Sequence, residues 1–141
     1  MPNIDLTFET GSLDEAQQTA IARELCDILM EIEGTKGSTG IALAGTWVIL
    51  NEVKPHSIAA GGRRDLPQPC FRMIVTVPAG ALNFEKKSAA VERLSLALLK
   101  IIGSEPTQDQ RLRVYCLIND LAEPSWGFMG HLFTAAELKG V

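Results

Sequence analysis

The chain has 141 residues, a mass of 15.3 kDa, 46% hydrophobic and 21% charged residues, and a formal net charge of −4. This size and composition are typical of one globular domain and exclude a disordered chain. The acidic balance argues against nucleic-acid binding, which normally needs a basic surface. No apolar run approaches the ~20 residues of a membrane span, and the N-terminus lacks the features of a signal peptide. We therefore expect one cytoplasmic domain, residues 1–141, that binds neither nucleic acid nor membrane.

The first half of the chain begins with a predicted strand and helix. Apolar and polar residues alternate over 3–9, which is typical of a strand with one buried face. Ser12 and Glu15 have the spacing of a capping box. A helix is therefore expected over 13–33, and Gly34 is suited to end it in the left-handed conformation.

The rest of the chain continues this pattern and then repeats it. The glycine-rich segment 35–45 predicts a loop, and 46–53 contains four consecutive apolar residues, as in a strand covered on both faces. A strand is expected over 71–77, a helix with an asparagine cap over about 83–102, and a fourth strand over 112–118. The predicted apolar face of the second helix comprises Phe84, Val91, Leu94, Leu98 and Ile101.

Matching positions indicate that the chain contains a duplication. At an offset of 68 residues they include Asn51 and Asn119, Ile58 and Trp126, and Gly62 and Gly130; at an offset of 69, Thr7 and Thr76, and Gly11 and Gly80. Chance is the alternative, because the identities are few, but the matching order of elements favours duplication. The predicted fold is α+β, an α/β two-layer domain. Duplicated β-α-β units, roughly 1–64 and 69–141, form a four-stranded sheet with two helices on one face.

Helices on one face leave the other face of the sheet uncovered. We expect Ile4, Leu6 and Phe8, together with the apolar second and third strands, to need cover from another subunit. The sequence therefore predicts an oligomer.

Several kinds of site are excluded by the residues present. His56 and His131 belong to no cluster with metal-ligand spacing. Neither a serine nucleophile elbow nor a phosphate-binding glycine loop occurs. Cys26, Cys70 and Cys116 are widely spaced without a CxxC motif, and we expect reduced, mostly buried thiols. No metal or cofactor is expected.

Pro2 is the one residue that offers an unusual chemistry. Methionine before a small residue is usually removed, which would leave proline with a free secondary amine. In an apolar pocket such an amine stays neutral more readily, since desolvation disfavours the ammonium form. A neutral amine can take a proton from a carbon next to a carbonyl. The alternative is that Met-Pro is a common start without functional meaning. A retained Met1 would make the proline nitrogen an unreactive amide.

The order of short motifs resembles the tautomerase superfamily. Pro2 opening a strand, Gly11-Ser12 before a helix, and the segments 48–53 and 61–62 resemble a 4-oxalocrotonate tautomerase subunit. The tail 119–133 resembles longer, fused members such as malonate semialdehyde decarboxylase, and the fused length resembles macrophage migration inhibitory factor. The resemblance covers nearly the whole chain and implies a homotrimer with an amino-terminal proline as catalytic base or acid.

The sequence departs from these relatives in its charged residues. The strand-to-helix loops, 9–12 and 78–81, contain no arginine, and the loop 35–45 has no acid that could activate water. The candidate substrate-binding residues that resemble positions of the family are Lys36, Ile58, Tyr115 and Trp126. Arg63 and Arg64, which follow Gly61-Gly62, and Arg72, which aligns with Asn3 in the repeat, are further cations that could meet a substrate carboxylate. For the cations a solvated surface position is the alternative, for Ile58 and Trp126 core packing, and for Tyr115 a subunit interface.

The predicted function is that of a tautomerase, an isomerase that moves a proton between carbon and oxygen of a small keto or enol acid, with Pro2 as the base. A hydratase-like or decarboxylase-like activity is the enzymatic alternative. A non-catalytic oligomeric module that binds small molecules is the alternative from another class, and the missing loop arginines support it. Without an acid near the pocket, hydrolytic dehalogenation is expected to be absent.

Overall fold

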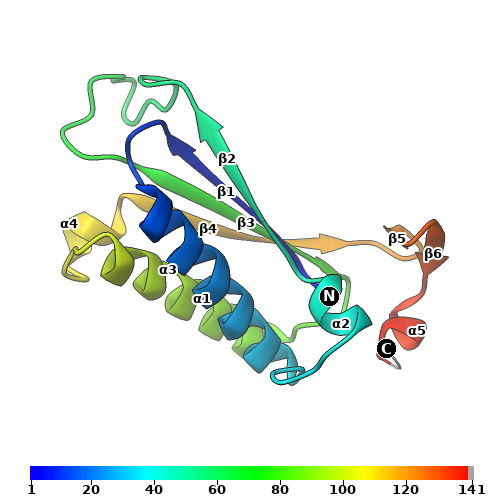
Figure 1. Ribbon diagram of the computed structural model, residues 1–141. Coiled ribbons are helices and arrows are strands. Elements are labelled where there is room, and N and C mark those ends of the chain that lie inside the picture. Colours follow the sequence, from blue (N-terminus) through cyan, green and yellow to red (C-terminus); the bar gives the residue numbers. More distant parts are fainter. Residues whose placement is uncertain (140–141) are drawn as a thin grey trace.

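The computed structural model describes residues 1–139 and shows a four-stranded sheet with two long helices on one face (Figure 1). The sheet order is β2-β1-β3-β4, with β1 parallel to β2, β3 parallel to β4, and β1 antiparallel to β3. The predicted fold class is confirmed. The main elements are β1 (Asn3–Glu9), α1 (Glu15–Glu33), β2 (Trp47–Val53), β3 (Phe71–Pro78), α3 (Phe84–Ile101) and β4 (Val114–Leu121).

Five shorter elements were not predicted. They are α2 (Ile41–Ala44), α4 (Gln108–Arg111), β5 (Trp126–Phe128), β6 (His131–Phe133) and α5 (Ala135–Lys139). The glycine-rich segment 35–45 therefore contains a helical turn as well as a loop. These elements have three to five residues each, which is too short for hydrophobic periodicity to reveal them.

An approximate twofold axis relates the two β-α-β units through the centre of the sheet. β1 and β3 run antiparallel, with Asn3 opposite Thr76 and Thr7 opposite Arg72. The sequence offset of 69 matches Asn3 to Arg72 and Thr7 to Thr76. The pair Asn3–Thr76 in one unit order therefore corresponds to the pair Arg72–Thr7 in the other, as a twofold axis requires. The sequence repeat therefore agrees with the twofold arrangement of β1 and β3. The boundaries of the two units stay a prediction.

The same type of turn occurs near the end of each unit. Residues 129–130 connect β5 to β6, and residues 61–62 connect Ala60 to Arg63, which pair as a one-bridge hairpin. All four turn residues have positive φ, between 55° and 77°. Two positive φ angles in a two-residue connection define a type I′ turn, whose twist suits a hairpin.

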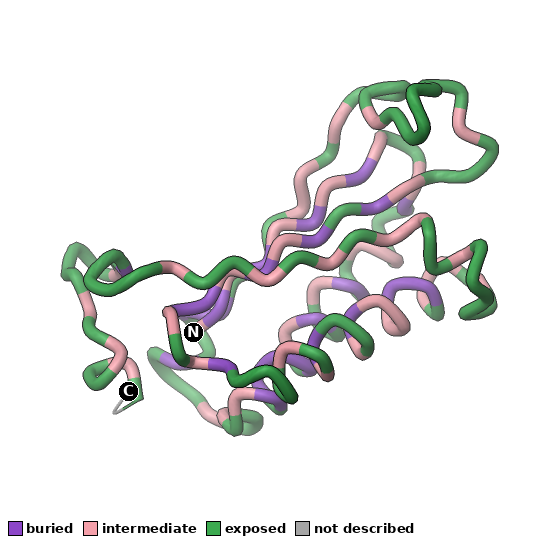
Figure 2. The backbone as a smooth tube through the Cα atoms, turned by 180° about the vertical axis from the view of Figure 1, so that it is seen from behind, coloured by how far each residue is buried: buried purple, intermediate pink, exposed green. Residues whose placement is uncertain are grey.

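The core lies between the sheet and the long helices, where Figure 2 shows the buried residues concentrated. Ile4, Leu6 and Phe8 are fully buried there. The prediction that these three residues face the uncovered side of the sheet is wrong. Their alternating polar neighbours occupy that side, because side chains of a strand point alternately to its two faces.

The uncovered face is apolar along the edge strands instead. On β2, Trp47 is 55% and Ile49 is 38% exposed; on β4, Tyr115 is 67% and Leu117 is 41% exposed. The expectation that 46–53 is covered on both faces is therefore not met within one chain. Such exposed apolar residues on the edge strands favour contact with a partner subunit.

The helix ends follow local capping chemistry, with one correction. Asp14, rather than Ser12, caps α1: its side chain accepts the Gln17 amide, and the Gln17 side chain accepts the Asp14 amide. Gly34 ends α1 with φ of 81°, as predicted. Asn83 caps α3 as predicted.

The packing of α3 differs from its predicted apolar face. Phe84 is 84% exposed and Val91 is 37% exposed, whereas Leu94 and Leu98 are fully buried as expected. Ala90 takes a buried position instead of Val91. The predicted face was therefore displaced at its N-terminal end.

The three cysteines are free and half-buried, so they are less enclosed than predicted. Burial raises the pKa of the Cys116 thiol to about 11, and it also raises the pKa of Cys26 and Cys70. Each therefore favours the unreactive thiol form. Within residues 1–139 no helix is both long and apolar enough to cross a bilayer.

Candidate functional site

Pro2 lies buried at the beginning of β1, where that strand meets β2. Its carbonyl accepts a hydrogen bond of 3.2 Å from the Trp47 amide. The bond fixes the direction of the chain at Pro2, and the sheet therefore holds the proline ring in a defined place.

A carboxylate lies beside the start of the chain. The Met1 amine is 3.3 Å from Glu33 Oε2, and the Glu33 side chain is only 11% exposed. Glu33 is the last residue of α1, whose C-terminus carries the negative end of the helix dipole. Both the carboxylate and the dipole favour a cation at this point.

Met1 fills space next to Pro2. Its side chain is 4% exposed and lies against Gly45, where a Cβ atom would overlap the methionine sulfur. Removal of Met1 would therefore open room beside Pro2 and leave the Glu33 carboxylate without its Met1 partner.

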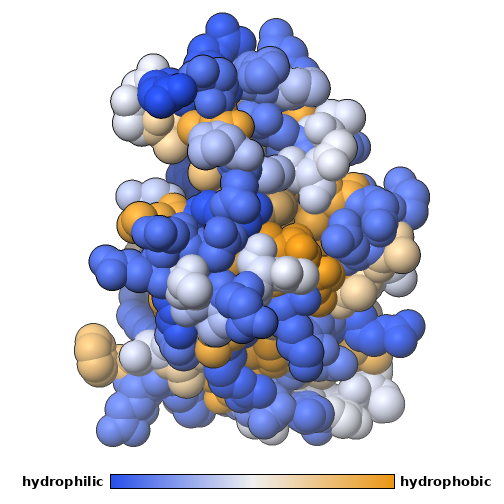
Figure 3. Space-filling view, turned by 90° about the vertical axis from the view of Figure 1, so that its left-hand side faces the viewer, coloured by the Kyte–Doolittle hydropathy of each residue, from blue (hydrophilic) through white to orange (hydrophobic). Residues whose placement is uncertain are grey.

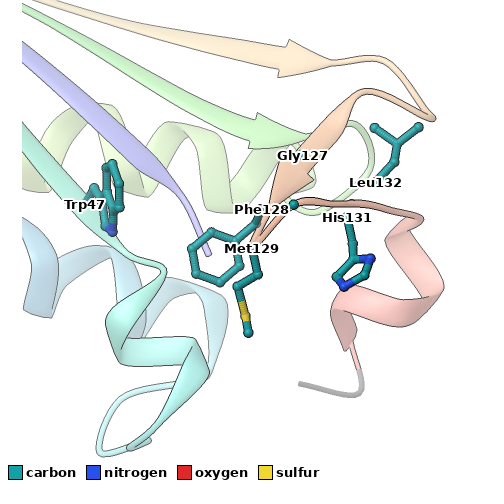
Figure 4. Close-up of a pocket in the computed structure, with 7 residues that line it drawn as sticks. Trp47, Gly127, Phe128, Met129, His131 and Leu132 are labelled. Carbon is teal, nitrogen blue, oxygen red and sulfur yellow. The ribbon is translucent and has the colours of Figure 1, made fainter.

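Aromatic side chains form the walls around this end of β1. A cavity of about 100 Å³ is lined by Asn3, Gly45, Trp47, Trp126, Gly127 and Phe128. A wider depression of about 530 Å³ continues along the β5–β6 hairpin (Figure 4), where Phe128 and Met129 lie between Trp47 and His131. Trp126 is 7% exposed, so its ring shields the cavity from solvent.

The predicted site residues form two groups within one chain. Trp126 is near Pro2, and Lys36 follows the end of α1 on the same side of the molecule, where its Nζ is 2.9 Å from Glu31. Ile58, Arg72 and Tyr115 line a separate pocket of about 400 Å³.

The separate pocket lies at the opposite end of the sheet from Pro2. Arg72 pairs with Thr7, near the far end of β1. One small substrate therefore cannot touch both Pro2 and Arg72 of the same chain. Arg63 pairs with Asp65 at 3.2 Å, and Arg64 donates to the His56 carbonyl, in the loop at this same far end.

The comparisons with known proteins bear on the fold. No protein-family model and no curated protein matches the sequence. Among solved structures, fused 4-OT in a symmetric trimer has a TM-score of 0.74 at 19% identity, over 95% of this chain and 96% of that one. N1, a member of the cis-3-chloroacrylic acid dehalogenase family, has a TM-score of 0.77 at 14% identity, over 98% and 89%. Pt0534 inactivated by 2-oxo-3-pentynoate has a TM-score of 0.76 at 17% identity, over 96% and 98%.

The chain has the fold of these solved structures. This confirms the fold that the resemblance to the tautomerase superfamily implies. Identities of 14–19% extend over nearly the whole chain, so the agreement is one of architecture.

Within this tautomerase fold, sequence reasoning missed Glu33, Trp47 and Phe128. An acid was expected in the loop 35–45 or shortly after Ile58 or Trp126, whereas Glu33 is the last helical residue before that loop. The signal was available, because a helix that packs antiparallel to β1 returns its C-terminus to the start of that strand. Among residues 1–139, no group of three His, Cys, Asp or Glu side chains is placed to hold a metal ion.

Proposed function

We propose that the protein is a tautomerase that moves a proton between carbon and oxygen of a small keto or enol acid, with the Pro2 amine as general base once Met1 is removed. The observation that supports this best is the placement of Pro2: it is buried and adjoins Asn3 of an aromatic cavity, and Glu33 lies beside the chain terminus.

The proposed reaction needs only proton transfer. The neutral Pro2 amine takes a proton from the carbon next to the carbonyl, and the electrons of that C–H bond move to the carbonyl oxygen to give an enolate. The Pro2 ammonium then returns the proton at another atom. Glu33 stabilises the ammonium between the two steps, and Trp47, Trp126 and Phe128 keep water away from it.

The substrate carboxylate needs a cation near Pro2. Lys36 is the candidate cation on this side of the chain, and its partner Glu31 is itself shared with Arg93 at 3.2 Å. An exposed pair of this kind exchanges readily with a ligand, since it contributes little free energy.

We propose further that the protein forms a homotrimer. The trimeric fused 4-OT structure and the exposed edge residues Trp47, Ile49, Tyr115 and Leu117 support this. Light scattering should give a mass three times that of the chain, and Leu117→Asp should lower it. A stable monomer at micromolar concentration would contradict the proposal. The three free thiols fit the cytoplasmic setting that we expect.

A hydratase-like or decarboxylase-like activity is the second candidate. Glu33 favours it, because a carboxylate beside the amine could take a proton from water. The expectation that hydrolytic dehalogenation is absent rested on the lack of such an acid, and we therefore include 3-haloacrylates among the substrates to be tested. A non-catalytic module remains the alternative if Met1 is retained.

Two measurements test the tautomerase proposal. Intact-mass spectrometry should show that Met1 is absent, and 2-oxo-3-pentynoate should then modify Pro2. The matched control carries a short N-terminal extension, which turns the Pro2 nitrogen into an amide and should abolish both modification and enol–keto conversion of phenylenolpyruvate. Equal turnover with the blocked chain would rule out Pro2 as the base.

A further inference from the structure

The pocket at the far end of the sheet has no role in the proposed reaction. It has a volume of about 400 Å³, and its walls include Ile58, Ala59, Phe71, Arg72, Arg113 and Tyr115. Seen from that end of the molecule, hydrophobic areas lie among hydrophilic side chains (Figure 3). The pocket therefore combines apolar surface with two guanidinium groups.

This pocket occupies the position that the twofold axis relates to the Pro2 cavity. The offset of 69 matches Pro2 to Phe71 and Asn3 to Arg72, and the offset of 68 matches Trp126 to Ile58. Each of these residues lines, or in the case of Pro2 borders, the cavity at its own end. The fold therefore forms the same kind of hollow twice.

Phe71 removes the base from the second hollow. Its backbone nitrogen is an amide that donates to the Arg113 carbonyl at 2.8 Å, and its side chain is 2% exposed. Cys70 also lines the pocket, but burial raises the pKa of its thiol. No group there is suited to take a proton from carbon.

Arg113 supplies a fixed cation. Its Nε donates to the Pro69 carbonyl at 2.8 Å, its Nη1 donates to Ser104 Oγ at 3.3 Å, and its guanidinium lies 6.0 Å from the centre of the Phe71 ring. Within residues 1–139, no carboxylate forms an ion pair with Arg113 or Arg72. The positive charge of this pocket is therefore uncompensated.

The nearest acid is already engaged. Glu9 Oε1 accepts the Ile58 amide at 2.9 Å, and backbone donors at Ile58, His56 and Ser57 lower the pKa of Glu9. These bonds satisfy the Glu9 carboxylate and hold the segment that carries Ile58 against the end of the sheet. The apolar wall is thus formed before any ligand arrives.

We propose that this pocket is a second, non-catalytic ligand site that binds a small monocarboxylate with an apolar body. The carboxylate pairs with the Arg113 guanidinium, whose Nη2 edge has no hydrogen-bond partner among the described residues, and Arg72 adds positive charge. Ile58 and Ala59 contact the apolar body. The volume suits a ligand about the size of an arylacetic acid.

The test uses the full-length protein with ¹³C-methyl-labelled isoleucine and methionine. Phenylacetate is the probe, and phenylacetamide is its uncharged control. We expect a saturable shift of the Ile58 methyl signal with phenylacetate and at least a tenfold weaker response to phenylacetamide. The Ile58 shift should persist in Pro2→Ala and in the N-terminally extended chain, which separates this site from the proposed function. Met129, beside the Pro2 cavity, reports on binding at the other end.

Two variants decide whether Arg113 holds the carboxylate. Arg113→Gln should weaken phenylacetate binding at Ile58 at least tenfold while leaving phenylenolpyruvate turnover unchanged, and Arg113→Lys should retain part of the affinity. An Ile58 signal that does not move at about 10 mM phenylacetate, enough to fill most sites with a millimolar Kd, would overturn the proposal. So would equal binding of phenylacetamide, or wild-type affinity in a folded Arg113→Gln.

Discussion

The two ends of the sheet share a backbone plan and differ in chemistry. At one end, Pro2 precedes Asn3, which lines a cavity together with Trp47 and Trp126; at the other, Phe71 lines a pocket with Tyr115 and Ile58 at the corresponding positions. Both ends have a parallel strand pair and a hairpin closed by the same type of turn.

The difference shows what a duplication can copy. A side chain or a hollow can be repeated at any position, but a secondary amine exists only where a chain begins with proline. The internal copy, Phe71, continues from Cys70 through an ordinary peptide bond, so its nitrogen cannot act as a base. Under our two proposals, one end therefore serves proton transfer, and the other, which has Arg113, binds a ligand without catalysis.

The largest difference between the two ends is expected to depend on Pro2. Pro2→Ala in the mature chain leaves a primary amine of different basicity and position, so kcat/KM for phenylenolpyruvate should fall about 100-fold or more. Burial lowers the pKa of the wild-type amine and Glu33 raises it, so a value below the ~8 of an ordinary α-amine, measured from the pH dependence of kcat/KM, would show that burial is the larger effect. Circular dichroism and light scattering should match the wild type. Full activity in this variant would show that Pro2 is not the base.

Much of the fold could be predicted from the sequence because its signals are local. The alternation of apolar and polar residues predicted β1. Asn83 predicted the start of α3, and Gly34 predicted the end of α1. The direction in which β1 faces could not be predicted so simply. Ile4, Leu6 and Phe8 identify an apolar face, but only the position of the helices determines which side of the sheet it occupies.

The site was harder to predict, because it depends on which strand ends meet. Pro2 and Trp126 are 124 positions apart in the sequence, and only the resemblance to a known family suggested that they belong to one site. Arg72 aligns with Asn3 in the repeat, yet the antiparallel β1–β3 pairing puts the two at opposite ends of the sheet. Aligning the two repeats shows which residues occupy equivalent positions in the two units, but it does not show which residues lie close together in the fold.

Glu33→Gln tests whether the carboxylate beside the chain terminus acts on the Pro2 amine. Loss of the negative charge removes an interaction that favours the Pro2 ammonium, so the amine should stay neutral to lower pH. The acid limb of the kcat/KM profile should therefore move down by about one pH unit. Glu31→Gln is the matched control, because Glu31 is also in the last turn of α1 but pairs with Lys36 and Arg93.

The Glu33 variant also separates the two candidate reactions. Tautomerase turnover should survive with a displaced pH profile, whereas any hydration of a 3-haloacrylate by the wild type should be lost. An unchanged profile in Glu33→Gln would show that Glu33 does not act on the Pro2 amine.

The two type I′ turns allow a paired test of the ends. Gly130→Ala and Gly62→Ala each put a side chain at positive φ, 77° and 76°, where no neighbouring atom would clash. Each should lower the free energy of unfolding by about 1 kcal/mol, measured by urea denaturation. Only Gly130→Ala should also lower kcat/KM a few-fold, because the β5–β6 hairpin forms a wall of the Pro2 cavity. An equal loss of activity in both variants would mean that the ends are coupled.

The smallest expected effect concerns the charge near Pro2. The Lys36 side chain is 61% exposed and pairs only with surface groups, so Lys36→Gln should change the unfolding free energy by less than about 1 kcal/mol. If Lys36 attracts the substrate carboxylate, KM should rise a few-fold with kcat nearly constant, and the difference should shrink at high salt because ions screen exposed charges. Lys54→Gln is the control, since this exposed lysine follows β2 at the far end of the sheet. A KM that rises equally in both variants would reflect net charge alone, and an unchanged KM in Lys36→Gln would leave the recognition of the carboxylate to a neighbouring subunit.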